Sequence, residues 1–129
     1  ADPRFRRLAL ATPGSVPLGT YARQSLKYYP LWDALSQRIV PLPDSQSVLA
    51  SVESGAADLG IVYPSDVRTS SRVKIVLELA EESHMPIQYF VALVAHQGAS
   101  PAVRPFLSFL KGGAARRLLI GAGFIPAFP

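Results

Sequence analysis

At 129 residues and 13.9 kDa, the chain has the length of one domain, or of one domain with part of another. Hydrophobic residues make up 49% of it, which supports a packed core and excludes a disordered chain. The absence of cysteine excludes disulfides and thiolate chemistry, and no apolar run reaches the ~20 residues of a membrane span.

The net charge of +4 and the pI near 9.8 suggest a nucleic-acid partner, but the distribution of the charges argues against one. Residues 1–82 carry nine basic and nine acidic residues, so the whole excess comes from a tail without acidic residues. The basic residues of this tail are Arg104, Lys111, Arg116 and Arg117. Four such charges are more typical of a solvated helix face than of a phosphate-binding track. We therefore expect no nucleic acid among the partners.

The first part of the chain alternates short apolar runs with helical patterns. Residues 8–11 form the first strand candidate, and the apolar spacing of residues 19–29 predicts a helix. Residues 31–35 add a helical turn. Residues 38–42 predict a second strand, although Pro41 weakens its hydrogen-bond ladder.

Residues 44–66 predict a complete unit of helix, turn and strand. Asp44 or Ser45 can cap the helix. Gly55 ends it, because glycine adopts a left-handed backbone conformation without strain. Residues 59–63 are almost wholly apolar, as expected of a parallel strand that is buried on both faces.

The three predicted strands follow a β-α-β-α-β pattern, which is the signature of a parallel sheet in an α/β fold. Ligands bind such open sheets at the carboxyl edge of the strands. Tyr63 ends the third strand just before Pro64, and the helix that begins at residues 44–45 follows the carboxyl end of the second strand. The sequence therefore predicts a site at this edge.

The remaining residues predict two more strands and two helices. Residues 73–79 alternate as a strand with one solvated face, and residues 87–95 are the most apolar run, as expected of a buried strand. A helix begins at Ser100 or nearer Val103. A last short helix covers residues 114–120.

A series of short motifs follows one another along most of the chain. They include Val-Pro-Leu-Gly-Thr-Tyr-Ala at residues 16–22 and Ala-Asp-Leu-Gly-Ile-Val-Tyr at residues 57–63. The others are residues 31–33, 48–49, 52–55, 65–66, 82–84, 86 and 123–124. Together, from about Arg7 to Phe124, they resemble the second half of the periplasmic molybdate-binding proteins of ABC importers. No single motif is decisive.

The resemblance implies a lobe of the type II periplasmic-binding-protein fold, a mostly parallel sheet flanked by helices in three αβα layers. Two such lobes close on a tetrahedral oxyanion. It also implies a binding protein and not an enzyme, with molybdate or tungstate as ligand, no cofactor, a periplasmic location and a membrane permease as partner. No signal peptide is present, so an exported form would be mature or trimmed. Neutral donors hold the anion, because helix N-termini offer unpaired N–H groups and a positive dipole end.

Carried over by position, the oxyanion contacts of the second lobe fall on Leu18, Ser45 and Tyr63. Leu18 and Ser45 would donate through their backbone amides. The family usually has alanine at the position of Leu18 and a small apolar residue, such as valine, at the position of Ser45. Ser45 would alternatively only cap its own helix. Tyr63 would donate its hydroxyl, or alternatively serve as a core residue with a solvated tip. The two histidines, His84 and His96, are interpreted as loop residues and not as metal ligands, so no metal is expected beyond that of the oxyanion.

By the same resemblance, residues 1–88 are the second lobe, and residues 89–129 are a return segment that would complete a first lobe whose N-terminal part is absent. The return segment would expose a large apolar surface, which soluble monomers avoid. Its apolar residues are Phe90, Val91, Leu93, Phe106, Leu107, Phe109 and Leu110. We therefore expect a homo-oligomer, a swapped dimer or refolding of the tail. A monomer with half of the site is expected to bind molybdate weakly or not detectably.

A second function class would keep the same lobe without transport. Related two-lobed folds serve as effector-sensing parts of bacterial transcription regulators, so a sensory or interaction module stays open. A DNA-binding segment elsewhere in the gene product would favour this alternative, and an upstream signal peptide with a first lobe would favour transport. No enzyme is expected, because no nucleophile motif accompanies the acidic pair Glu81–Glu82 and His84.

Overall fold

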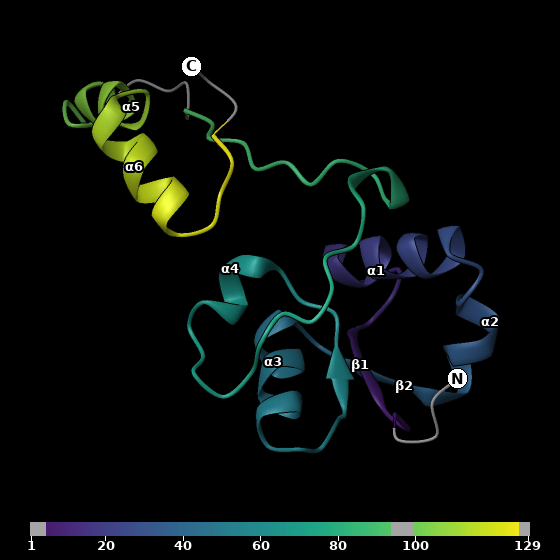
Figure 1. Cartoon of the computed structure of the whole chain (residues 1–129). Coiled ribbons are helices and arrows are strands. Elements are labelled where there is room, and N and C mark those ends of the chain that lie inside the picture. Colours follow the sequence, from purple (N-terminus) through teal and green to yellow (C-terminus); the bar gives the residue numbers. More distant parts are fainter. Residues whose placement is uncertain (1–4, 94–99, 127–129) are drawn as a thin grey trace. The chain divides into compact units, whose positions relative to one another are not determined.

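The computed structural model describes residues 5–93 and 100–126. The chain divides into two compact units, Ala1–Pro86 (unit 1) and Ile87–Pro129 (unit 2). Figure 1 labels their α-helices and the strands β1 and β2. This division lies two residues before the boundary that the sequence suggested between residues 88 and 89. That residues 1–88 are a second lobe and residues 89–129 a return segment of a first lobe stays a prediction.

Unit 1 is built on a three-stranded parallel sheet, as predicted. Its strands are β1 (Leu8–Ala11), β2 (Ile39–Leu42) and β3 (Leu59–Gly60), in the order β2-β1-β3. Pro41 is tolerated because β2 lies at the edge of the sheet, where a strand needs partners on one side only. β3 is shorter than expected, and the Ile61 N–H continues it by one bond, 3.2 Å long, to the Ala9 carbonyl.

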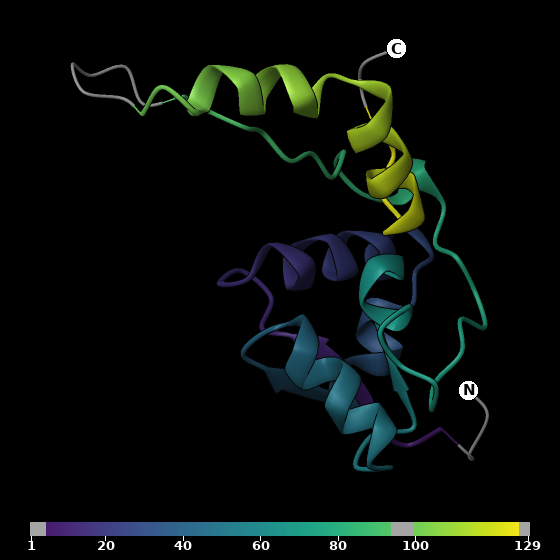
Figure 2. The same cartoon turned by 90° about the vertical axis from the view of Figure 1, so that its left-hand side faces the viewer.

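Helices cover both faces of this sheet (Figures 1 and 2). Those of unit 1 are α1 (Pro17–Tyr28), α2 (Trp32–Leu35), α3 (Ser45–Glu53) and α4 (Pro64–Val67), with 3₁₀ turns η1 (Ser36–Arg38) and η2 (Glu81–Ser83). Alternate residues of β1 face opposite layers. Ala9 packs with Val48 of α3, whereas Leu10 packs with Ala22 of α1. The predicted three-layer α/β lobe is therefore confirmed.

The ends of α3 follow the predicted chemistry. Asp44, and not Ser45, is the N-cap residue, because its Oδ1 accepts the Ser47 N–H at 2.7 Å. Gly55 follows the helix with φ = 74°, the left-handed conformation that a side chain would disfavour.

The strands predicted at residues 73–79 and 87–95 are wrong as far as the structure describes them. Residues 73–79 and 87–93 have no regular secondary structure, and residues 94–95 lie outside the described part. Val76 and Leu77 are 69% and 74% exposed. Alternation and apolarity indicate extended backbone, but a strand also needs a neighbour to receive its hydrogen bonds. β3 offers only a two-residue ladder, which pairs with β1.

In the described part of unit 2, two helices contact each other, α5 (Val103–Leu110) and α6 (Gly113–Gly121). The later of the two expected helix starts, Val103, is confirmed. The apolar surface expected of this segment is present, with Phe90 85% exposed and Phe106 56% exposed. Among the described residues, no helix has the length and apolarity required to cross a bilayer.

Asp58 joins the beginnings of β1 and β3 and gives a testable pH dependence. Its Oδ2 accepts the N–H groups of Arg7 at 2.8 Å and Arg6 at 2.9 Å. These donors, Arg7 first, lower the pKa of Asp58 below its usual 3.8. Because the pKa is lower in the folded state, this stabilisation is present above pH 3.8 and is lost as the pH falls through the folded-state pKa.

We therefore expect the thermal midpoint of unit 1 to decrease as the pH falls below 3.8, and that of Asp58→Asn to decrease less steeply. Circular dichroism melts of both proteins across this range measure the difference. Parallel profiles for the two proteins would contradict the assignment to Asp58.

Candidate functional site

The carboxyl edge of the sheet in unit 1 gathers the three residues predicted to bind the ligand. β1 leads into α1, β2 leads into α3, and β3 leads through Val62 to Tyr63. Thr12, which follows β1, holds the start of the β1–α1 connection against the end of β2. Its N–H and its Oγ1 both donate to the Leu42 carbonyl, at 2.8 and 3.0 Å. The carboxyl ends of parallel strands lie at one edge of the sheet. Leu18, Ser45 and Tyr63, which follow these strand ends, therefore lie at the same edge.

The N-terminus of α1 has donors without acceptors. Val16 is the N-cap residue and makes no side-chain capping bond, and Pro17 at the first helical position has no N–H. The Thr20 N–H bonds to the Val16 carbonyl at 3.1 Å. This leaves the N–H groups of Leu18 and Gly19, for which the described residues provide no acceptor.

The Leu18 side chain, which stands where the family usually has alanine, lies in the core and not at the edge of the sheet. It is 4% exposed and packs in the core with Ala9, Val48 and Ala57. Only the backbone of Leu18 is therefore oriented for an external ligand, as the resemblance implies for this position.

Gly19 is a second donor that the sequence reasoning missed. A Cβ atom at this position would lie 2.2 Å from the Ala11 carbonyl oxygen and 2.7 Å from the Thr12 carbonyl carbon. The glycine therefore allows α1 to begin directly against the end of β1. The signal was available in the sequence, since a helix that begins Val-Pro-Leu-Gly lacks a capping side chain.

The N-terminus of α3 offers the Ser45 N–H to an outside acceptor. Asp44 accepts the Ser47 N–H through its side chain, and its carbonyl accepts the Val48 N–H at 3.2 Å. The Ser47 N–H, and to a lesser degree the Gln46 N–H, lower the pKa of Asp44. The Ser45 N–H has no acceptor among the described residues. Because Asp44 is the cap, the alternative that Ser45 caps its own helix is wrong.

Tyr63 stands at the N-cap position of α4 and is half-buried. Its side chain packs against the core cluster that contains Leu18 and Val48. One cluster thus joins the segment after β3 to the beginnings of α1 and α3. We call the N–H groups of Leu18, Gly19 and Ser45, together with the Tyr63 hydroxyl, the donor edge.

Asp66 lies beside the donor edge and was assigned no role from the sequence. Its N–H donates to the Tyr63 carbonyl at 3.0 Å, and its Oδ1 accepts the Gln46 Nε2–H at 3.3 Å. Its Oδ2 is buried and has no hydrogen-bond partner in the described part of the chain. The sequence motif at residues 65–66 marked the position, but gave no sign of a buried oxygen.

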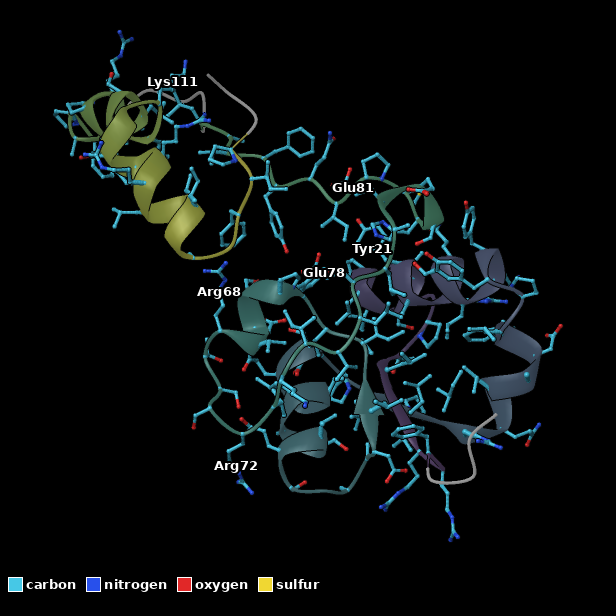
Figure 3. The ribbon with its side chains drawn as sticks, viewed as in Figure 1. Tyr21, Arg68, Arg72, Glu78, Glu81 and Lys111 are labelled. Carbon is cyan, nitrogen blue, oxygen red and sulfur yellow. The ribbon has the colours of Figure 1, made fainter. Side chains whose placement is uncertain are left out.

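His84, one of the two histidines, packs against α1. The His84 Nδ1 lies 2.8 Å from the Met85 carbonyl, and the ring packs 5.8 Å from that of Tyr21, which Figure 3 labels on α1. Ser83, just before it, is buried and bonds to Ser25 of α1 at 2.8 Å, so this segment is a structural contact with α1. His96 lies outside the described residues. Within residues 5–93 and 100–126, no group of three potential metal ligands occurs.

Comparisons with known proteins agree with this architecture. A family model described as bacterial extracellular solute-binding protein matches residues 1–125. The chain is 41% identical over 119 residues to the molybdate-binding protein ModA of Escherichia coli and 38% identical over 118 residues to that of Haemophilus influenzae. It is 36% identical over 118 residues to a putative ABC transporter substrate-binding lipoprotein of Bacillus subtilis.

Solved structures of solute-binding proteins share this fold. The substrate-binding domain of a putative molybdenum ABC transporter from Clostridium difficile superimposes with a TM-score of 0.82 at 31% identity, over 97% of this chain and 56% of that one. The periplasmic molybdate-binding protein of Azotobacter vinelandii gives 0.75 at 25% identity, over 95% and 55%. The alignments with the Escherichia coli and Haemophilus influenzae proteins cover 92% and 91% of this chain but 46% of either relative, so the chain spans about half of their length.

Proposed function

The chain belongs to the family of bacterial extracellular solute-binding proteins, and from this membership we propose that it binds a tetrahedral oxyanion, molybdate or tungstate. It would do so as one lobe of the solute-binding component of an ABC importer, in the periplasm, with a membrane permease as partner. The names of its relatives refer to molybdate and to ABC transporters, which supports this proposal over a sensory module.

The observation that carries the proposal is a set of N–H groups at two helix N-termini on one edge of the sheet, for which residues 5–93 and 100–126 provide no acceptor. Leu18 and Gly19 supply donors from α1, and Ser45 supplies one from α3. Such groups, with the positive ends of the helix dipoles, stabilise an anion without a buried cation. In this proposal, the Tyr63 hydroxyl donates a further hydrogen bond, which makes the donor edge the binding site.

The proposed site is half of a complete one. In the binding proteins that the chain resembles, a first lobe is expected to supply further hydroxyl donors and to close over the anion. Each charge-assisted hydrogen bond contributes about 1.5–3 kcal/mol, so the loss of two would lower the affinity by several orders of magnitude. A monomer of this chain is therefore expected to bind molybdate weakly, with a dissociation constant on the order of millimolar.

Isothermal titration with molybdate, on a sample whose mass in solution is determined in parallel, tests this expectation. Weak heats from a monomer are the expected result. Tight binding by a proven monomer would contradict the half-site. Tight binding by a dimer would instead support the expectation that a second copy covers the exposed apolar surface of unit 2 and completes the site.

A further inference from the structure

Thr12 joins the two chain segments that lead to the helix starts of the donor edge. It follows β1 directly, and its N–H and its Oγ1 both donate to the carbonyl of Leu42, the last residue of β2, at 2.8 and 3.0 Å. β1 and β2 are neighbours in the sheet (Figure 1). The two bonds therefore fix the beginning of the β1–α1 connection to the beginning of the β2–α3 connection. The hydroxyl proton of Thr12 is used within the protein in these bonds.

On the side of α1, the Thr12 carbonyl holds the turn that precedes the helix. It accepts the N–H groups of Ser15 at 3.3 Å and of Val16, the N-cap residue of α1, at 3.1 Å. The first turn of α1 also lies against Thr12, since a Cβ atom on Gly19 would be 2.7 Å from the Thr12 carbonyl oxygen. The position of Thr12 therefore determines where the N–H groups of Leu18 and Gly19 lie.

On the side of α3, two residues, Pro43 and Asp44, separate Leu42 from Ser45. The ring of Pro43 restricts its own φ, and Asp44 has an extended backbone while its carboxylate caps the helix. Because few torsions between Leu42 and Ser45 are free, the direction of the Leu42 carbonyl determines the direction of the Ser45 N–H. Thr12 holds that carbonyl with two hydrogen bonds, so it fixes this helix start as well.

Resting on the proposed function, we propose that Thr12 is a positioning residue for the oxyanion. Its hydroxyl keeps the starts of α1 and α3 in the arrangement in which their N–H groups meet on one anion. Without Oγ1, the Thr12 N–H still bonds to the Leu42 carbonyl, so the strands stay paired while the two helix starts gain freedom to move apart. The arrangement that binds the anion is then populated for a smaller fraction of the time, and the apparent affinity falls by that fraction.

Thr12→Val tests this role, because it removes the hydroxyl and keeps the branched shape of the side chain. We expect it to weaken molybdate binding about two- to tenfold, the range set by the net contribution of one hydrogen bond. Thr12→Ser restores the hydroxyl and is expected to bind within about twofold of the wild type. Dissociation constants come from the amide shifts of the native signals, at a temperature where thermal melts show every protein to be folded. A substitution that only lowers the stability of the fold leaves these constants unchanged.

Thr69→Val is the matched control. Thr69 also donates through its N–H and its Oγ1 to a single carbonyl, that of Asp66, at 3.1 and 2.7 Å, but these bonds lie within one turn of the chain. This variant is expected to keep the wild-type affinity. If Thr12→Val does not fold, Thr12→Ala, which also lacks Oγ1, takes its place with the same expected loss.

The outcomes separate this inference from the proposed function. Wild-type affinity in Thr12→Val, an equal loss in Thr12→Ser, or an equal loss in Thr69→Val would overturn the role of Thr12 and leave the proposed function intact. If molybdate shifts neither the Leu18 nor the Ser45 amide of the wild-type protein, the proposed function fails and the inference fails with it.

Discussion

Gly19→Ala is expected to destabilise unit 1 by about 3 kcal/mol or more. The added Cβ would lie 2.2 Å from the Ala11 carbonyl oxygen, and both atoms belong to rigid elements. To relieve the overlap, α1 must move away from the end of β1, and Leu18, which is 4% exposed, must leave its place in the core. Urea unfolding of the variant and the wild type measures the loss.

Gly121→Ala is the matched control for this substitution. No atom of the described residues lies within 4 Å of the Cβ that it would add on α6. Alanine favours a helix over glycine by about 1 kcal/mol, so this variant is expected to be as stable as the wild type or slightly more stable. Comparable losses in both variants would show that the close approach at Gly19 is not the cause.

Ser45→Pro is expected to weaken molybdate binding by roughly ten- to a hundredfold, the loss of one charge-assisted hydrogen bond of about 1.5–3 kcal/mol. Proline is favoured at the first position of a helix, so the change removes the N–H donor and leaves α3 intact. Asp44, with φ = −158° and ψ = 176°, already has the extended backbone that a residue before proline requires. The dissociation constant from amide shifts is the readout.

Ser45→Ala separates the amide from the hydroxyl at this position. It removes the Ser45 Oγ and keeps the N–H group, so the affinity is expected to stay within about threefold of the wild type. If the alanine variant loses as much affinity as the proline variant, the hydroxyl and not the amide is the donor. Circular dichroism of both variants checks that the helix content is unchanged.

The part of the fold that the sequence predicted depends on local chemistry. The alternation of strand and helix, the cap at Asp44 or Ser45 and the stop at Gly55 each follow from a few neighbouring residues. The structure has the alternation, with the cap at Asp44 and the stop at Gly55. Residues 73–79 and 87–93 were predicted wrongly because their apolar patterns suit a strand, but pairing depends on segments far away in sequence. A pattern specifies the conformation that a segment favours, and not the neighbour that would complete it.

The candidate site was predictable to a similar degree. Leu18, Ser45 and Tyr63 follow the three strand ends, and the topology places strand ends at one edge. Gly19 was missed because its role depends on the approach of α1 to the Ala11 carbonyl. Asp66 was missed because burial of one carboxylate oxygen depends on how α4 packs against α3. Neither fact is encoded in the local spacing of residues.

The most direct test of the donor edge is an amide chemical-shift titration of the unmodified chain with molybdate. We expect the largest shifts to fall on Leu18, Gly19 and Ser45, at the starts of α1 and α3, and to saturate together with one dissociation constant. Shifts that fall instead on the basic residues of unit 2, such as Arg104 and Lys111, or no shifts at these three amides, would contradict it.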